Sequence, residues 1–66
     1  MGRLDTRIRI AIMRELPDGF AFPELRERFR GVADGRLRRV LHQLRKEGRV
    51  RCEGHGRAGR WHREVE

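Results

Sequence analysis

The chain has 66 residues, enough for a single domain over residues 1–66, and a chain of this length hides only about 60% of its surface on folding. No room remains for a buried catalytic cavity beside a core, so length argues against an enzyme. Lysine and arginine number 17 against 10 acidic residues, and the formal net charge of +7 indicates a polyanionic partner.

The first predicted element is a helix from residue 5 or 6, where Asp or Thr can cap it, to about residue 16. Its apolar residues recur every four positions, as Leu4, Ile8, Ile12 and Leu16. Ile10 and Met13 lie off this stripe, so the helix is either central in a three-helix core or has a second partner. Pro-Asp-Gly at residues 17–19 then predicts a turn.

A short strand and a second helix are predicted next. Residues 20–22 alternate large, small and large, which indicates a strand able to pair with a later hairpin in a small antiparallel sheet. Pro23 suits the first position of a helix, and Glu24 complements its positive N-terminal dipole. Leu25 and Phe29 are four apart and should point inward.

A turn and a basic third helix follow. Gly31 is free to adopt a positive φ in the turn, where Val32 fills the gap between helices, and the third helix is expected over residues 34–47. One face of it is apolar, formed by Leu37, Val40, Leu41 and Leu44. The other faces are polar or basic and carry Arg36, Arg38, Arg39, His42, Gln43, Arg45 and Lys46.

The C-terminal third has the pattern of a hairpin. Gly48 is expected to end the helix as a left-handed cap, and residues 50–53 alternate like a strand. Residues 54–59 are too rich in glycine to pack, which predicts a flexible tip before a second strand around Trp61. The core predicted from these periodicities consists of Ile8, Ile12, Leu16, Leu25, Phe29, Val32, Leu37, Leu41, Leu44, Val50 and Trp61.

Chemistry-bearing residues do not combine into a catalytic, metal or cofactor site. The histidines (His42, His55 and His62) lack ligand spacing, and no Ser-His-Asp cluster, carboxylate pair or phosphate-binding glycine loop is present. Cys52 stands alone, which excludes an internal disulfide, and it is interpreted as a small buried hydrophobe. Trp61 is interpreted as packing rather than stacking on a base. With no apolar run near the ~20 residues of a membrane span and no signal-peptide pattern, we expect a cytoplasmic protein without a membrane partner.

The order of these parts resembles the winged helix-turn-helix family of DNA-binding domains over nearly the whole chain. The resemblance rests on Glu24-Leu25, Gly31-Val32, the apolar stripe of the third helix, and Glu47-Gly48-Arg49-Val50. It implies an α+β fold of three helices with a small antiparallel sheet, made of the short strand 20–22 and a hairpin wing. Two departures are Ala33, where a capping residue is usual, and the lack of a dimerisation helix after the wing.

The resemblance also implies roles for individual residues. Helix 34–47 would enter the major groove of double-stranded DNA, with Arg36, Arg39 and Gln43 facing base edges. Arg38, His42 and Lys46 would lie near phosphates, and the 54–59 wing would rest on the backbone through Arg57 and Arg60.

Three functions are compatible with this sequence. The first is a small basic DNA-binding protein, a transcription regulator or a phage-type accessory factor. The second is a winged-helix protein-interaction module, in which Ile10 and Met13 mediate homodimer or partner contact. The third is an RNA-binding winged helix, which shares the electrostatics and differs in groove geometry.

Overall fold

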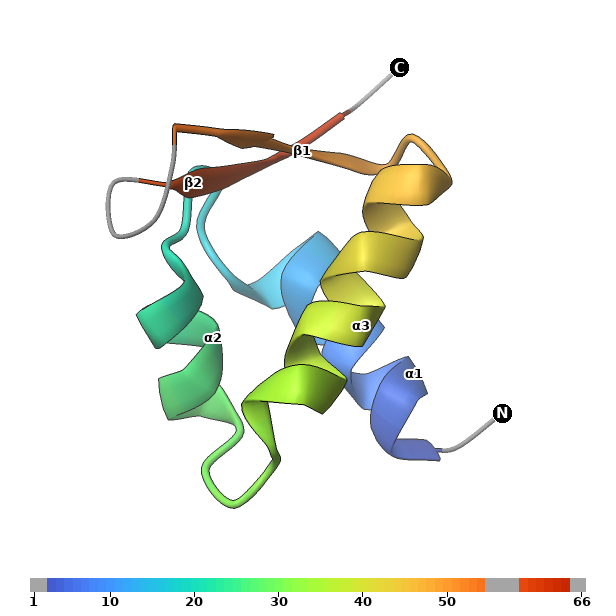
Figure 1. Cartoon of the computed structure of the whole chain (residues 1–66), viewed down its shortest axis with the longest axis vertical. Helices are drawn as coiled ribbons and strands as arrows, with labels where there is room; N and C mark the ends of the chain where they lie inside the picture. The colour runs from blue at the N-terminus through green and yellow to red at the C-terminus, as the bar shows by residue number, and fades with distance from the viewer. Residues whose placement is uncertain (1–2, 55–58, 65–66) are drawn as a thin grey trace.

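The computed structural model describes residues 3–54 and 59–64 as three helices followed by a two-stranded antiparallel hairpin (Figure 1). The elements are α1 (Arg3–Ile10) with its π-helical continuation η1 (Ala11–Glu15), α2 (Phe22–Arg28), α3 (Asp34–Lys46), β1 (Val50–Glu53) and β2 (Arg60–Arg63). This is the predicted α+β class, in a layout consistent with a small winged helix. The hairpin begins beside the C-terminal end of α3 and extends towards the segment that leads into α2 (Figure 1).

The first helix changes geometry halfway along its length. Ile10 keeps helical angles, so η1 continues α1 without a break, and the N–H of Leu16 donates to the carbonyl of Ala11 at 2.8 Å. That i to i+5 bond closes a π turn, which takes up one more residue than an α turn. The predicted end near residue 16 is therefore confirmed, whereas the helix begins at Arg3, before the predicted cap at residue 5 or 6, and its π-helical second half was not predicted.

The predicted strand over residues 20–22 is wrong in its extent. Phe20 makes a single bridge to Trp61, whereas Phe22 is already the first residue of α2. The competing interaction is a cap: the Glu24 carboxylate accepts the N–H of Ala21 at 2.6 Å, and the Glu24 N–H donates to the carbonyl of Ala21 at 2.9 Å. This reciprocal pair starts the helix one residue before the predicted Pro23.

Both turns around α3 have the predicted glycine conformations. Gly31 has φ +89° before α3, and Gly48 has φ +78° after it. At the second turn the N–H of Arg49 donates to the carbonyl of Leu44 at 2.9 Å, and that of Gly48 to Arg45 at 3.0 Å. These two bonds form a Schellman cap, so the predicted left-handed cap at Gly48 is confirmed. The last helical residue is Lys46, one residue before the predicted end.

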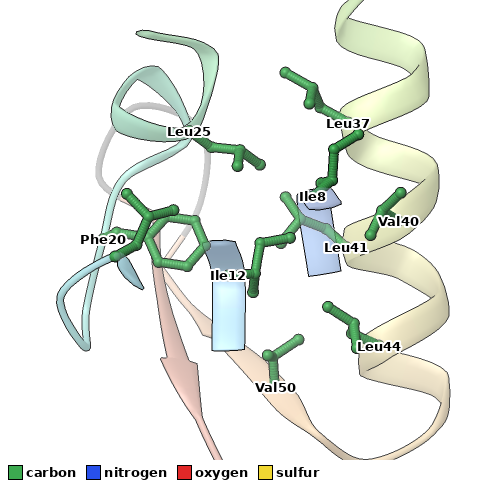
Figure 2. Packing of buried hydrophobic residues seen from close by; sticks show 10 residues of the cluster. Ile8, Ile12, Phe20, Leu25, Leu37, Val40, Leu41, Leu44 and Val50 are labelled. Carbon is green, nitrogen blue, oxygen red and sulfur yellow. The ribbon is translucent and has the colours of Figure 1, made fainter. Parts of the chain in front are cut away.

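The core lies between α1, α2, α3 and the hairpin. Figure 2 shows Ile8 and Ile12 lying between α2 and α3, with Val50 of the hairpin at one end. The buried apolar residues are Ile8, Ala11, Ile12, Leu16, Phe20, Leu25, Leu37, Val40, Leu41, Leu44 and Val50. Of the predicted core, Phe29, Val32 and Trp61 are only partly buried against it, and Phe20, only 2% exposed, is the large member that the prediction lacked.

Hydrogen bonds attach the hairpin to the first interhelical loop. Within the hairpin, Cys52 stands opposite Trp61. Outside it, the N–H of Gly19 donates to the Trp61 carbonyl at 2.9 Å, and the N–H of Trp61 donates to the Phe20 carbonyl at 2.8 Å. The orientation of β2 is therefore fixed by residues 19–20, where the third strand was expected.

Helix length and hydropathy also bear on membrane insertion. Within the described segments, no helix is both long enough and apolar enough to cross a bilayer.

Candidate nucleic-acid interface

The acidic side chains of residues 3–54 and 59–64 are all engaged within the protein. Each carboxylate in the described part of the chain has an N–H or cationic partner. The pairs are Asp5 with Arg36, Glu15 with Arg28, Asp18 with Arg63 and His62, Glu24 with Ala21, Glu27 with Arg30, Asp34 with Arg26, Glu47 with Arg9 and Arg49, Glu53 with Arg51 and His62, and Glu64 with Arg51.

The cations that remain are most numerous on α3. Over residues 3–54 and 59–64, the Lys and Arg side chains without a carboxylate partner are Arg38, Arg39, Arg45 and Lys46 on α3, Arg3, Arg7 and Arg14 on the first helix, and Arg60 and Arg63 on β2, where the Arg63 guanidinium bonds backbone carbonyls instead. Uncompensated charge attracts polyanions, whereas paired surface charges contribute little field. Helix α3 is therefore the strongest candidate for an anion-binding element.

Helical spacing divides the exposed part of α3 into three faces. Each residue advances by about 100°, so Arg39, His42 and Lys46 lie together, opposite the buried stripe. All three are exposed, and they line a shallow hollow with Gln43 and Arg45. We call Arg39, His42 and Lys46 the outer ridge. It carries three of the predicted contact residues on one surface.

The face of α3 toward α1 is occupied by internal contacts. Arg36 donates from Nε to Oδ1 of Asp5 at 3.0 Å, and Gln43 donates from Nε2 to Oε2 of Glu47 at 3.2 Å. Arg9 also donates to Glu47, at 2.8 and 3.2 Å. Arg36 is thus separated from the outer ridge, whereas Gln43 lines the hollow beside it while bonded to Glu47, so the predicted trio of base readers is split.

The pKa of Glu47 reflects this cluster. Its carboxylate accepts hydrogen bonds from Arg9, the largest effect, and from Gln43, which together lower its pKa from an ordinary 4.5 to about 2. The same hydrogen bond raises the pKa of Arg9. Glu47 therefore stays ionised at neutral pH and holds the ends of α1 and α3 together.

The face of α3 toward α2 borders an open groove. The guanidinium of Arg38 lies 4.4 Å from the centroid of the Phe22 ring, a cation–π distance. The groove has a volume of about 650 Å³ and is lined by Phe22, Pro23, Arg26, Arg38, Leu41, His42, Arg45, Cys52, Gly59 and Trp61. We call this the α2–α3 groove.

Arg45 is a functional candidate that the sequence prediction omitted. It lines both the groove and the hollow beside the outer ridge, and it has no carboxylate partner among the described residues. From the sequence it was placed on the basic faces of the helix but was assigned no contact with DNA. Its spacing of seven residues from Arg38 places both on the same side of α3, and that spacing was the available signal.

The two predicted wing residues have different outcomes. Arg60 is exposed at the start of β2, opposite Glu53 in the strand register. Arg57 lies outside the described residues. Arg60 therefore stays a candidate phosphate contact at the edge of the hairpin.

The remaining predicted features can also be located. Ile10 is exposed, at 44%, whereas Met13 is partly buried and packs against the core, so the two do not form one exposed patch. Cys52 is half-buried. His62 lies between Asp18 and Glu53, and across the described residues no three His, Cys, Asp or Glu side chains gather in a metal-binding arrangement.

Comparison with known proteins gave no matching family model, no matching curated protein and no matching solved structure. We therefore infer function from the charge and geometry of α3 and its surroundings.

Proposed function

We propose that this chain is a small DNA-binding protein of the winged helix-turn-helix type, acting as a transcription regulator or an accessory factor. The observation that carries the proposal is that all described acids are paired internally, while four cations of α3 are not. An α-helix of 13 residues is about 20 Å long and fits the major groove of B-DNA. The proposal commits α3 to that groove.

The proposed roles follow the faces of α3. Arg39, at the N-terminal end of the outer ridge and near the middle of α3, is the base reader, since a guanidinium bonds both O6 and N7 of guanine. Arg38, Arg45 and Lys46 flank it and contact phosphates, together with Arg60 of the hairpin. Arg36 supports the interface through its contact with Asp5 of α1, and Gln43 through its contact with Glu47, and they reach bases only if those contacts open.

Duplex RNA is the less favoured ligand. The major groove of A-form RNA is deep and narrow, so it does not admit a helix, and a protruding ridge such as that of α3 has no groove to enter. Binding that is equal for duplex RNA and duplex DNA would contradict the proposal, because it would mean that charge alone determines affinity.

The test is a fluorescence anisotropy titration with duplex DNA of about two helical turns, at several salt concentrations. With about five phosphates neutralised, the logarithm of the binding constant should fall against log salt with a slope of about −4 to −5. Arg45→Ala should reduce that slope by about one. The matched control is Arg14→Ala, which removes the same charge from η1, and it should leave the slope nearly unchanged.

Sequence reading is tested separately, on a duplex selected from a random pool. Arg39→Ala should weaken binding to the selected site by about 1–3 kcal/mol and bring it close to the affinity for random DNA. Arg45→Ala should weaken both duplexes alike. If Arg39→Ala reduces the difference in affinity between the selected and random duplexes no more than Arg14→Ala does, α3 does not read sequence.

The protein-interaction alternative depends on Ile10, the exposed apolar residue of α1. Sedimentation velocity of the wild type and of Ile10→Glu distinguishes it from DNA binding. We expect the same monomeric coefficient for both proteins and unchanged DNA affinity. A larger wild-type species that Ile10→Glu dissociates would favour the interaction module.

A further inference from the structure

We propose that the α2–α3 groove binds a small aromatic anion, a flat ring carrying one acidic group. The groove is bounded by α2, α3 and the hairpin, and its volume of about 650 Å³ lies within the range of about 300–1,000 Å³ typical of small-molecule sites. Its lining combines apolar surface with basic side chains, and each half of the proposed ligand matches one of these.

The apolar side of the groove can accept a ring. Leu41, Cys52 and Trp61 line the groove, and Trp61 is half-buried and stands opposite Cys52 in the strand register. The Phe22 ring already has guanidinium groups over it, Arg38 at 4.4 Å and Arg26 at 5.4 Å. The indole of Trp61 is therefore the aromatic surface with which a ligand ring would stack, in the offset geometry that aromatic pairs prefer.

The basic side of the groove requires an anion. Arg38 and Arg45 have no carboxylate partner in the described segments, whereas Arg26 is held by Asp34 at 2.8 Å. A guanidinium binds a carboxylate through two parallel hydrogen bonds, which is stronger than a contact with a neutral polar group. A neutral aromatic compound would leave the positive charge of this wall unpaired, so the acidic group determines selectivity.

The sequence provides a direct probe of this groove. Trp61 is the only tryptophan and the chain has no tyrosine, so fluorescence excited at the red edge of the indole band comes from one groove residue. Phenylacetate, phenylacetamide and acetate are suitable ligands for titration. The first two have the same ring and nearly the same shape, but the amide replaces the anionic oxygen by a neutral NH2 group, and acetate carries the charge without the ring.

We expect phenylacetate to change the Trp61 emission saturably, with a Kd on the order of 1 mM, as for a ligand of few atoms in an open groove. Phenylacetamide should bind at least ten-fold more weakly, and acetate at the same ionic strength should have no effect. Equal responses to phenylacetate and phenylacetamide, or a response to phenylacetate that never saturates, would overturn the proposal.

Matched variants test the role of the basic wall. Arg45→Gln should weaken phenylacetate binding several-fold, whereas Arg39→Gln, which changes the outer ridge outside the groove, should not. Equal effects of the two variants would assign the signal to net charge and overturn the site. Thymidine monophosphate has the same combination of ring and anion. If the groove binds thymidine monophosphate more tightly than phenylacetate, its natural ligand is a nucleotide.

If the proposed function also holds, occupancy of the groove should reduce DNA affinity, because Arg38 and Arg45 would serve both ligands. The two proposals fail separately. The fluorescence titration is performed on free protein. DNA binding without a phenylacetate response would contradict only the ligand site in the groove. A phenylacetate response without DNA binding would contradict only the DNA proposal.

Discussion

The guanidinium of Arg63 donates a hydrogen bond from Nη1 to the carbonyl oxygen of Leu16 at 2.7 Å. The same atom donates to the carbonyl of Ile12 at 3.2 Å. Carbonyls at the end of a helix lack partners within the helix, and here a side chain from the last strand supplies one. The N–H of Arg63 also donates to Asp18 at 2.7 Å, so this residue joins the hairpin to the end of the first helix.

Replacing Arg63 should therefore destabilise the fold rather than only change its charge. We expect Arg63→Ala to lower the free energy of unfolding by about 1–3 kcal/mol, since it leaves half-buried carbonyls without a charged donor. Urea denaturation measures this. The control is Arg60→Ala on the same strand, where the side chain is exposed, and an equal loss in both variants would contradict the role given to Arg63.

Acid stability should depend on the contact between Arg9 and Glu47. The pKa of Glu47 is lowered to about 2, so its contribution to stability is complete above about pH 4.5 and is lost as the pH falls towards 2. The pKa of Asp18 is also lowered, chiefly by the N–H of Arg63 and next by His62, and acts in the same direction. In Arg9→Gln the acid unfolding midpoint should move to a higher pH.

Circular dichroism against pH measures that midpoint. The charge-matched control is Arg7→Gln. Arg7 lies on the same helix as Arg9 and has no carboxylate partner in the described chain. Identical midpoints for Arg9→Gln and Arg7→Gln would show that the Glu47 contact contributes nothing to acid stability.

Burial predicts which apolar positions on the helices determine stability. Leu37 is 0% exposed in the core, and Leu37→Ala should cost about 2–5 kcal/mol. A domain of this size has a total stability of only about 3–10 kcal/mol, so the variant should be close to unfolding. Ile10→Ala, at a position 44% exposed, should stay within about 0.5 kcal/mol of the wild type. Thermal unfolding of both variants would refute the placement of the core if Ile10→Ala were the less stable.

Two glycines flanking the exposed face of α3 should respond oppositely to alanine. Gly48 has φ +78°, so Gly48→Ala should cost about 1–2 kcal/mol although no atom blocks the new methyl group. Gly35 is helical with open space around it, and Gly35→Ala should raise the free energy of unfolding by at most about 1 kcal/mol. Chemical denaturation of the pair separates backbone strain from steric contact, and a stabilised Gly48→Ala would contradict the Schellman cap.

Features of the fold that depend only on residues close together in the sequence could be predicted. The apolar stripe of α3 and the glycine after it are such features, because periodicity and a single backbone conformation determine them. The predicted strand over residues 20–22 was wrong because Glu24 caps the helix from within its first turn. The alternation of large and small residues, on which the strand was predicted, gives no information about this cap. The π turn of η1 has no sequence pattern at all.

The candidate site was predictable only in part, for a related reason. Helical spacing was enough to place Arg39, His42 and Lys46 away from the buried stripe, although the prediction divided them between base and phosphate contacts. It could not show that Arg36 is held by Asp5, 31 positions away, since that contact depends on how α1 packs against α3. The α2–α3 groove likewise depends on three elements meeting, which no local pattern contains.

The π turn also determines how the chain could change in length. The N–H of Leu16 bonds the Ala11 carbonyl five residues earlier, so Leu16 lies where the fourth residue after Ala11 would lie in an α-helix. If the same residues formed an uninterrupted α-helix, Leu16 would be rotated by about 100° around the helix axis, out of the core, and its carbonyl would turn away from Arg63. The π turn therefore absorbs one residue and keeps the direction in which the chain leaves the first helix, so deletion of the exposed Arg14 should be less damaging than a one-residue deletion within α3.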